Sequence, residues 1–280
     1  MARKFFLSLV TLALLVTACT QQPLEAVLEE ETMREEEMVD EEMEDESMMD
    51  EEMEDESMMD EEMEDDSMVD EEMEMHGATF TVRIENLSTS ESMALPVLLA
   101  PGTWVVFKEG EPIFKAGEAD RDLGLEALAE DGNPAELSAS LGEYMGIIST
   151  GVFDTPVGAE QPGVAGPGAA FEFIFHGSEG EKFTFATMFV ESNDLFYAPE
   201  GQGVDLFTEE GEPISGDLSS SIFLWDAGTE MNQQPGTGAD QAPRQAGANT
   251  GKDEGGVVQL VEDMYTYPEG VIRVTITPEK

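Results

Sequence analysis

Acidic residues follow two segments of the sequence that have the composition of β-strands. Asp194 comes shortly after the apolar segment 182–190, and Asp226 and Glu230 follow the segment 221–225. Turns at strand ends can hold carboxylates together, and such oxygens suit Ca²⁺, which takes roughly 6–8 oxygen ligands. Asp226 and Glu230 are four residues apart across a glycine, so both can point into one pocket with Asp194. Because the chain has 63 acidic residues, solvated loop carboxylates are the competing interpretation.

Residues suited to nucleophilic catalysis are scarce. The chain has two histidines, His76 and His176, and a single cysteine, and it shows no Ser–His–Asp pattern and no phosphate-binding glycine loop. Asp154-Thr155 resembles the start of an aspartic-protease motif, but Pro156 stands where that motif has glycine, and no second copy occurs. We therefore expect a protein that is not an enzyme. A hydrolase that uses Asp or Glu with a bound metal ion is the alternative.

The single cysteine, Cys19, closes a segment typical of exported bacterial lipoproteins. A positively charged start precedes an apolar run over residues 5–16, which is too short to cross a hydrocarbon layer of about 30 Å as a helix. Residues 16–19 are Val-Thr-Ala-Cys and resemble the lipobox. We expect residues 1–18 to be removed as a signal peptide and Cys19 to be lipidated. The lipid would anchor the protein to a membrane of the cell envelope, facing the periplasm or the cell exterior.

Residues 19–76 form an acidic, methionine-rich tract. The formal net charge of the chain is -51, and 29 of its acidic residues lie between Glu25 and Glu74 with a single basic residue. From Asp40 a ten-residue unit, DEEMEDESMM, repeats with small changes, and methionine recurs every five residues. A period of five fits neither a helix nor a strand, and dense like charge keeps a chain solvated. We expect a disordered tether between the anchor and a folded domain.

Two kinds of metal binding are open for this tract. Thioethers are soft ligands for Cu(I), and His76 closes the tract, although no other histidine stands among the methionines. The carboxylates can instead attract divalent cations weakly and without specificity. A structural envelope protein is a further alternative, in which the tether sets the distance between the membrane and the domain.

Residues 77–280 have the length and texture of one all-β domain. They contain 34 acidic and nine basic residues, a net charge of -25 that repels nucleic acid and attracts cations. Short apolar or alternating runs separated by Gly, Pro, Asn and Ser predict an antiparallel β-sandwich. The runs expected to form strands are residues 79–84, 104–107, 169–175, 182–190, 221–225 and 270–277.

The segments between these strands predict a hairpin-like connection and two short helices. Residues 176–181 contain two glycines and predict a hairpin-like connection between segments 171–175 and 182–190. Residues 123–129 are rich in Leu, Ala and Glu and predict a short helix. A second short helix is expected to begin near Asn133, with this residue as the cap and Pro134 at the first helical position.

Four segments of this domain resemble the bacterial branch of the spondin N-terminal domain family. They are residues 186–190, 192–196, 224–230 and 241–247, and the S-x-D-x-F and D-A-G-T-[DE] motifs among them are the most specific. The resemblance covers most of residues 78–277. It implies a C2-like β-sandwich that acts outside the cell as a non-enzymatic adhesion or ligand-binding module.

The same resemblance implies calcium as the cofactor and Asp194, Asp226 and Glu230 as its ligands. Animal members usually have aspartate at the third of these positions. Their disulfides have no counterpart in a chain with one cysteine.

Overall fold

The computed structural model describes residues 76–89, 97–261 and 270–279. The expected signal peptide, the lipidated Cys19 and the tether up to residue 75 lie outside these ranges and stay predictions. In the described part of the chain, every helix is too short or too polar to span a membrane.

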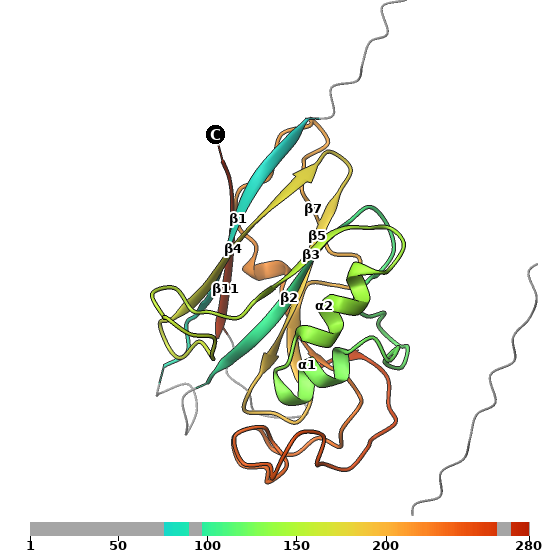
Figure 1. The fold of residues 1–280 in the computed structure, drawn as a ribbon, viewed down its shortest axis with the longest axis vertical. Coiled ribbons are helices and arrows are strands. Elements are labelled where there is room, and N and C mark those ends of the chain that lie inside the picture. The colour runs from blue at the N-terminus through green and yellow to red at the C-terminus, as the bar shows by residue number, and fades with distance from the viewer. Residues whose placement is uncertain (1–75, 90–96, 262–269, 280) are drawn as a thin grey trace, which may run out of the picture. The chain divides into compact units, whose positions relative to one another are not determined.

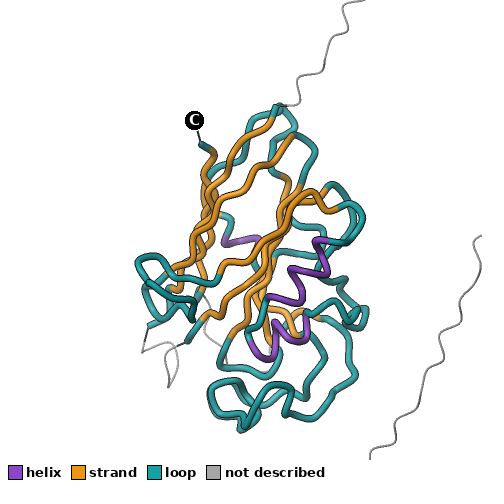
Figure 2. The backbone as a smooth tube through the Cα atoms, viewed as in Figure 1, coloured by secondary structure: helices purple, strands orange, loops and turns teal. Residues whose placement is uncertain are grey.

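Two antiparallel sheets pack face to face and form the domain (Figures 1 and 2), which confirms the expected all-β sandwich. The first sheet has the order β4 (Ala170–Ser178), β1 (Gly77–Asn86), β11 (Ile272–Pro278) and β8 (Gly216–Asp217). The second has the order β10 (Gln259–Leu260), β9 (Phe223–Asp226), β6 (Leu195–Ala198), β5 (Lys182–Phe189), β2 (Leu99–Phe107) and β3 (Ile147–Phe153). A further short strand, β7 (Val204–Asp205), lies outside this order and pairs with the start of β5. The C2-like character implied by the spondin resemblance stays a prediction.

The main core lies between the two sheets and is rich in phenylalanine. In β1 the buried positions alternate with partly exposed ones, so that Phe80, Val82 and Ile84 point inward. Phe175 of β4 stacks on Phe183 of β5 across the gap, with ring centroids 5.0 Å apart. Aromatic contacts of this kind join the sheets without a disulfide.

A second core lies on the outer face of the β5 sheet, under two helices (Figure 1). They are α1 (Leu125–Asp131) and α2 (Ala135–Gly142), and a 3₁₀ turn covers Ser219–Ser221 elsewhere. Both predicted short helices are present, but their bounds differ from the expectation: α1 begins and ends two residues later, and α2 begins at Ala135 with Pro134 at the cap position, one residue later than expected. Asn133 accepts a hydrogen bond from the amide of Ala135 at 3.2 Å, as a helix-starting side chain does.

The expected hairpin between residues 171–175 and 182–190 is wrong. β4 pairs with β1 and β5 pairs with β2, so the tight turn between β4 and β5 joins two different sheets. The burial patterns explain the separation. β4 alternates between buried and exposed residues, as in a sheet with one solvated face, whereas all residues of β5 after Lys182 are buried, because helices cover its other face.

Candidate metal centre

The turn between β5 and β6 places the first acidic residue. Ser192 fixes this turn, because its hydroxyl donates to the carbonyl of Phe189 at 2.5 Å and accepts from the amide of Leu195 at 3.1 Å. Asp194 therefore stands directly before β6. In the register of β6 and β9, Leu195 lies opposite Asp226, which is the last residue of β9. Strand pairing thus sets the two aspartates side by side, as the sequence predicts.

Asp194 is fully buried, and its two carboxylate oxygens have different surroundings. Oδ2 accepts hydrogen bonds from the backbone amides of Thr229 at 2.9 Å and Glu230 at 3.1 Å. Oδ1 is buried without a hydrogen-bond partner among the described residues. An unpaired buried carboxylate oxygen is costly, so this atom is the unsatisfied position of the site.

Asp226 is also fully buried and is held by a turn that follows its strand. Its Oδ1 accepts from the amide of Gly228 at 2.8 Å, and its Oδ2 accepts from the side-chain amide of Asn232 at 2.8 Å. Gly228 has φ of 70°, and a Cβ there would lie 2.6 Å from the amide nitrogen of Val257. Glycine is therefore required where the turn meets the loop that brings in the third acidic residue.

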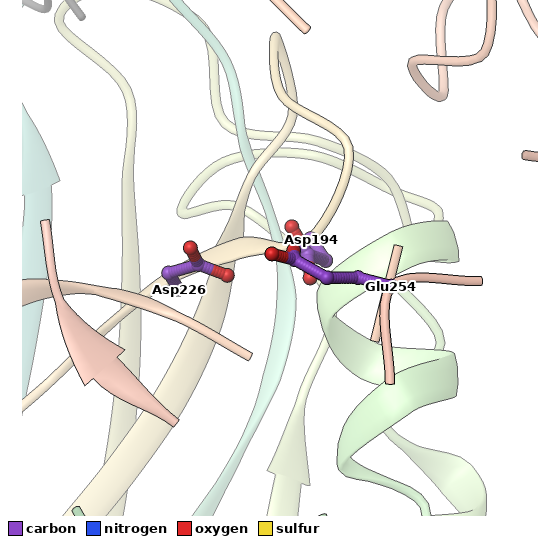
Figure 3. Close-up of side chains that lie close together, drawn as sticks. All are labelled: Asp194, Asp226 and Glu254. Atoms are coloured by element: carbon purple, nitrogen blue, oxygen red, sulfur yellow. The ribbon is translucent and has the colours of Figure 1, made fainter. Parts of the chain in front are cut away.

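Glu254 is the third acidic residue at this place, and it is exposed. Its loop runs alongside the turn after β9, since the amide of Glu254 donates to the carbonyl of Thr229 at 2.8 Å. One carboxylate oxygen from each of Asp194, Asp226 and Glu254 lies within 4.8 Å of the others, and Figure 3 shows these side chains converging. Within the described ranges, none of the three forms an ion pair with lysine or arginine.

Glu230 lies next to this group but is not one of its three members. Its backbone amide supports Asp194, and the residue forms an isolated β-bridge with Asp253. The side chain is buried, and Oε1 has no hydrogen-bond partner in the described part of the chain. A Cβ on Gly251 would lie 0.9 Å from that oxygen, so the carboxylate fills the space that this glycine leaves open. The structure thus brings together two of the three predicted ligands and adds Glu254.

Two carboxyl groups of the cluster, those of Asp194 and Glu254, have raised pKa values, which indicates that a bound cation would be stabilised there. Burial raises the pKa of Asp194, and the nearby charge of Asp226 raises it further, while the amides of Glu230 and Thr229 oppose both effects. Burial also raises the pKa of Glu254, and Asp226 again adds to the increase. Carboxylates that resist ionisation because they are buried near one another regain their charged form when a metal ion lies between them.

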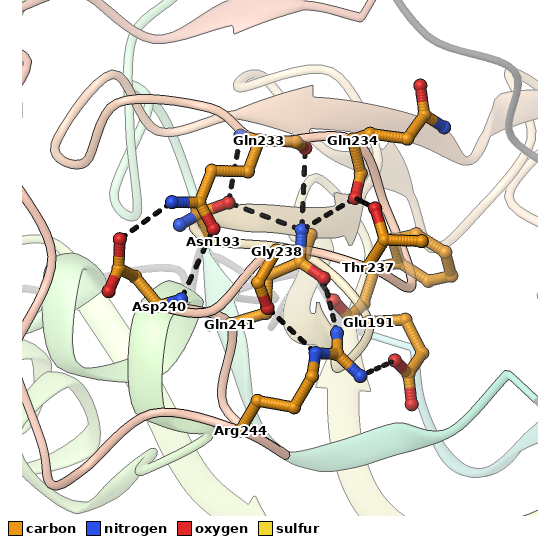
Figure 4. A network of polar contacts seen from close by, with 11 residues as sticks. Glu191, Asn193, Gln233, Gln234, Thr237, Gly238, Asp240, Gln241 and Arg244 are labelled. Atoms are coloured by element: carbon orange, nitrogen blue, oxygen red, sulfur yellow. Dashed lines mark hydrogen bonds and ion pairs between the residues drawn. The ribbon is translucent and has the colours of Figure 1, made fainter. Parts of the chain in front are cut away.

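A buried polar network holds the neighbouring loop against the turn that contains Asp194 (Figure 4). Asn193 accepts a hydrogen bond from the amide of Gln233 at 2.9 Å. Gln241, which is fully buried, donates to the carbonyl of Gln234 at 3.0 Å. Arg244 forms an ion pair with the buried Glu191 at 3.0 Å. Gln241 and Arg244 belong to residues 241–247 of the spondin resemblance. In the structure, their contacts hold the neighbouring loop against the turn that contains Asp194.

A second concentration of acidic residues lines an open pocket of about 290 Å³ beside α1. Its acidic residues are Asp120, Asp122, Glu126, Glu130, Asp131 and Glu136. Burial raises the pKa of Glu130 to about 7. The loop that carries Glu254 is attached here too, because Asn249 donates to Glu126 at 2.9 Å and Gln245 donates to Asp131 at 2.7 Å.

No protein-family model matches this chain, and a search of the curated proteins gives no match. The relation to spondin domains therefore stays an expectation from the quoted motifs.

Proposed function

We propose that this chain is an exported, lipid-anchored protein whose β-sandwich binds calcium through Asp194, Asp226 and Glu254. The bound ion would order one end of the sandwich, so that the domain serves as a non-enzymatic adhesion or ligand-binding module outside the cell. The observation that carries the proposal concerns Asp194: its buried Oδ1 has no hydrogen-bond partner among the described residues, and its carboxylate lies close to those of Asp226 and Glu254.

The ligand chemistry favours calcium over other common metal ions. All three side chains offer carboxylate oxygen, which suits hard cations, and neither histidine nor cysteine belongs to the group. Two residues are buried and one is exposed, so backbone carbonyls and water can complete an irregular shell. Calcium tolerates such a shell, whereas Mg²⁺ demands near-octahedral geometry at roughly 2.0–2.1 Å.

A bound ion would join three separate parts of the chain. They are the turn before β6, the end of β9, and the loop around Glu254. Without a cation, mutual repulsion of the carboxylates opposes this arrangement. The proposal therefore predicts that calcium stabilises the loops at this end, which form the surface offered to a ligand.

The test is a calcium titration of the full chain by calorimetry, with thermal melts in calcium and in chelator. Asp194→Asn and Asp226→Asn keep the side-chain shape and remove the charge. Glu160→Gln, at an exposed loop position, is the control for unspecific attraction of cations by this acidic chain. Extracellular sites bind with Kd of about 10⁻⁴–10⁻³ M, and at about 100 times Kd the folded state gains roughly 2.7 kcal/mol.

We expect wild type and Glu160→Gln to gain the same melting temperature on adding calcium, and the two aspartate variants to lose most of that gain. An equal gain in all four proteins would contradict the proposed site. Strontium should substitute for calcium better than magnesium does.

A further inference from the structure

Strand β3 is one edge of the larger sheet, and its outer side is open. Within the described ranges, β3 pairs with β2 alone. Apart from this pairing, no other described residue forms a hydrogen bond to the backbone of residues 148–153. An edge strand with unpaired amides and carbonyls is a template for pairing with a further strand.

β3 lacks most of the features that protect an edge strand from association. Residues 147–153 are Ile-Ile-Ser-Thr-Gly-Val-Phe, with no charge and no proline, in a domain with 34 acidic residues. The protective feature that it has is a β-bulge at Ile148, which has no partner in β2. The other long edge strand, β4, carries the exposed Glu172, and its Ala170 carbonyl accepts a hydrogen bond from the amide of Val157 at 2.8 Å. Of the two long edges in the described sheets, β3 is therefore the one open to pairing.

Apolar side chains of β3 are exposed beside this edge. Gly151 and Phe153 face the main core, since a Cβ on Gly151 would lie 2.7 Å from the ring of Trp104, and Phe153 is buried in that core. By the alternation of a strand, Val152 points to the opposite face, which carries α2, and it is 40% exposed. Ile148, at the bulge, is 49% exposed. A strongly acidic domain thus has exposed apolar side chains along an unpaired strand.

The sequence of β3 is self-complementary for antiparallel pairing with a second copy. Symmetric pairing about Thr150 places Ile148 opposite Val152 of the second copy, and Val152 opposite its Ile148. These two are the exposed apolar residues of the strand, and opposed β-branched residues stabilise an antiparallel pair. A two-fold contact of this kind uses the same surface on both copies, so it closes as a dimer and does not propagate into a filament.

The charges that flank β3 are compatible with this register. The nearest acidic residues in the sequence are Glu143 and Asp154. In the symmetric pairing they lie opposite Val157 and Gly146 of the second copy, so carboxylates do not face each other.

Helix α2 packs against β3, and two-fold pairing brings the α2 helices of both copies to the same face of the joined sheet. The exposed residues of α2 include Ala135, Ala139 and Gly142, which are spaced four and three positions apart and share one side of the helix. Small side chains on that side allow a close approach of two helices, which pairing of the strands requires.

We propose that a second copy of this chain pairs with the outer edge of β3, so that the domain forms an antiparallel two-fold dimer. The interface is separate from the proposed calcium site, because β9, which carries Asp226, lies four strand spacings or roughly 19 Å from β3 in the sheet. The negative charge of both domains opposes association at long range, so the dimer should become tighter as salt screens this repulsion.

The test is sedimentation equilibrium of the full chain over a range of protein and salt concentrations, in chelator so that cations do not bridge the acidic chains. Every protein carries Cys19→Ser, which removes the lipidation site and the native thiol. Val152→Lys places a charge at the edge of β3. Ile174→Lys is the matched control, because Ile174 is 57% exposed on β4, the other long edge strand. Circular dichroism checks that both variants fold.

Cysteine variants test the register. Two Thr150→Cys chains bring their thiols together at the axis, where opposed Cα atoms lie about 4.5–5.5 Å apart, within the range that a disulfide spans. Val152→Cys alone should not cross-link, whereas an equal mixture of Val152→Cys and Ile148→Cys should.

We expect the Cys19→Ser chain to form a dimer that tightens between about 0.01 M and about 1 M salt, as the Debye length falls from roughly 30 Å to 3 Å. Val152→Lys should weaken the dimer at least tenfold, and Ile174→Lys should leave it unchanged. The proposal is overturned if the Cys19→Ser chain is still a monomer at about 1 mM, or if Ile174→Lys weakens the dimer as much as Val152→Lys does. It is also overturned if Thr150→Cys chains do not cross-link, which would leave the edge of β3 open to a strand of another protein.

Discussion

The backbone amide of Glu230 donates a hydrogen bond of 3.1 Å to the carboxylate of Asp194, so Glu230 supports the acidic cluster through its main chain. The side chain of Glu230 points elsewhere, into the space left by Gly251. Substituting the side chain therefore leaves the amide in place. This relationship allows the contributions of Glu230 and Glu254 to be separated.

We predict that Glu254→Gln weakens calcium binding more than Glu230→Gln does. The first change removes a carboxylate of the three-residue group, and the second leaves that group intact. The reduction should be about tenfold for Glu254→Gln, which corresponds to roughly 1.4 kcal/mol. Calorimetry on both variants decides between the ligand set from the sequence resemblance and the one that the geometry supports. If Glu230→Gln weakens calcium binding more than Glu254→Gln does, the ligands are those that the sequence resemblance implies, with Glu230 as the third.

We predict that the calcium-free domain becomes less stable as the pH rises from 4.5 to about 7. Burial raises the pKa of Glu130 across this interval and also raises that of Asp194. A carboxyl whose pKa is raised by folding binds more protons in the folded than in the unfolded state between the two values. Its contribution to stability is complete below the unfolded pKa and is lost as pH rises through the folded pKa.

Melting temperatures in chelator across this pH range measure the effect. Glu130→Gln, which cannot ionise, should show a shallower fall than wild type. Calcium should counteract the fall, because the ion stabilises the charged form of Asp194. A melting temperature that rises with pH in chelator would show that these carboxyls do not determine the pH dependence.

We predict that Arg244→Met destabilises the domain by about 3 kcal/mol, the lower end of the range for breaking a buried ion pair, because Arg244 is partly exposed. The change leaves the charge of the buried Glu191 without its partner. The double variant Arg244→Met with Glu191→Gln should recover much of the loss, since no unpaired charge remains. Urea unfolding measures both. Equal losses in the single and double variants would mean that packing, rather than charge, is lost.

We predict that Cys19→Ala abolishes membrane association. The apolar run and the lipobox-like residues 16–19 motivate this expectation. Detergent phase partitioning of cells that express wild type or the variant measures it, and mass spectrometry of the mature N-terminus shows the acyl chains. If both proteins fractionate alike in the aqueous phase, Cys19 is not an anchor.

The sequence predicted the strands in which apolar residues alternate with polar ones or form a continuous run. The alternating run at residues 79–84 lies within β1, and the apolar run at 182–190 is β5. β3, at residues 147–153, was missed because Ser, Thr and Gly interrupt its apolar residues and, in this edge strand, Phe153 alone is buried. β6, at residues 195–198, has only four residues, and such a length gives no readable period.

The site was predictable to the extent that it depends on strand ends. Asp194 and Asp226 were found because each adjoins a strand, and sheet register brings them together. Glu254 was missed because it lies 28 residues beyond Asp226, in a loop with no strand signal. What brings it near is a set of backbone contacts, such as the hydrogen bond of 2.8 Å from the amide of Gly256 to the carbonyl of Gly228. Backbone hydrogen bonds depend little on the identity of the side chains, so the sequence shows no pattern that predicts them.

The place where β1 begins has a mechanical consequence. Any pull transmitted from the N-terminal side enters the domain at Gly77 and runs along a ten-residue strand that is paired on both sides. A load along a strand shears its hydrogen bonds together instead of opening them one after another. If a ligand is held at the opposite end, near Asp194, tension passes through the sandwich along its strands. The resistance of the domain to force then depends on its unfolding rate under load.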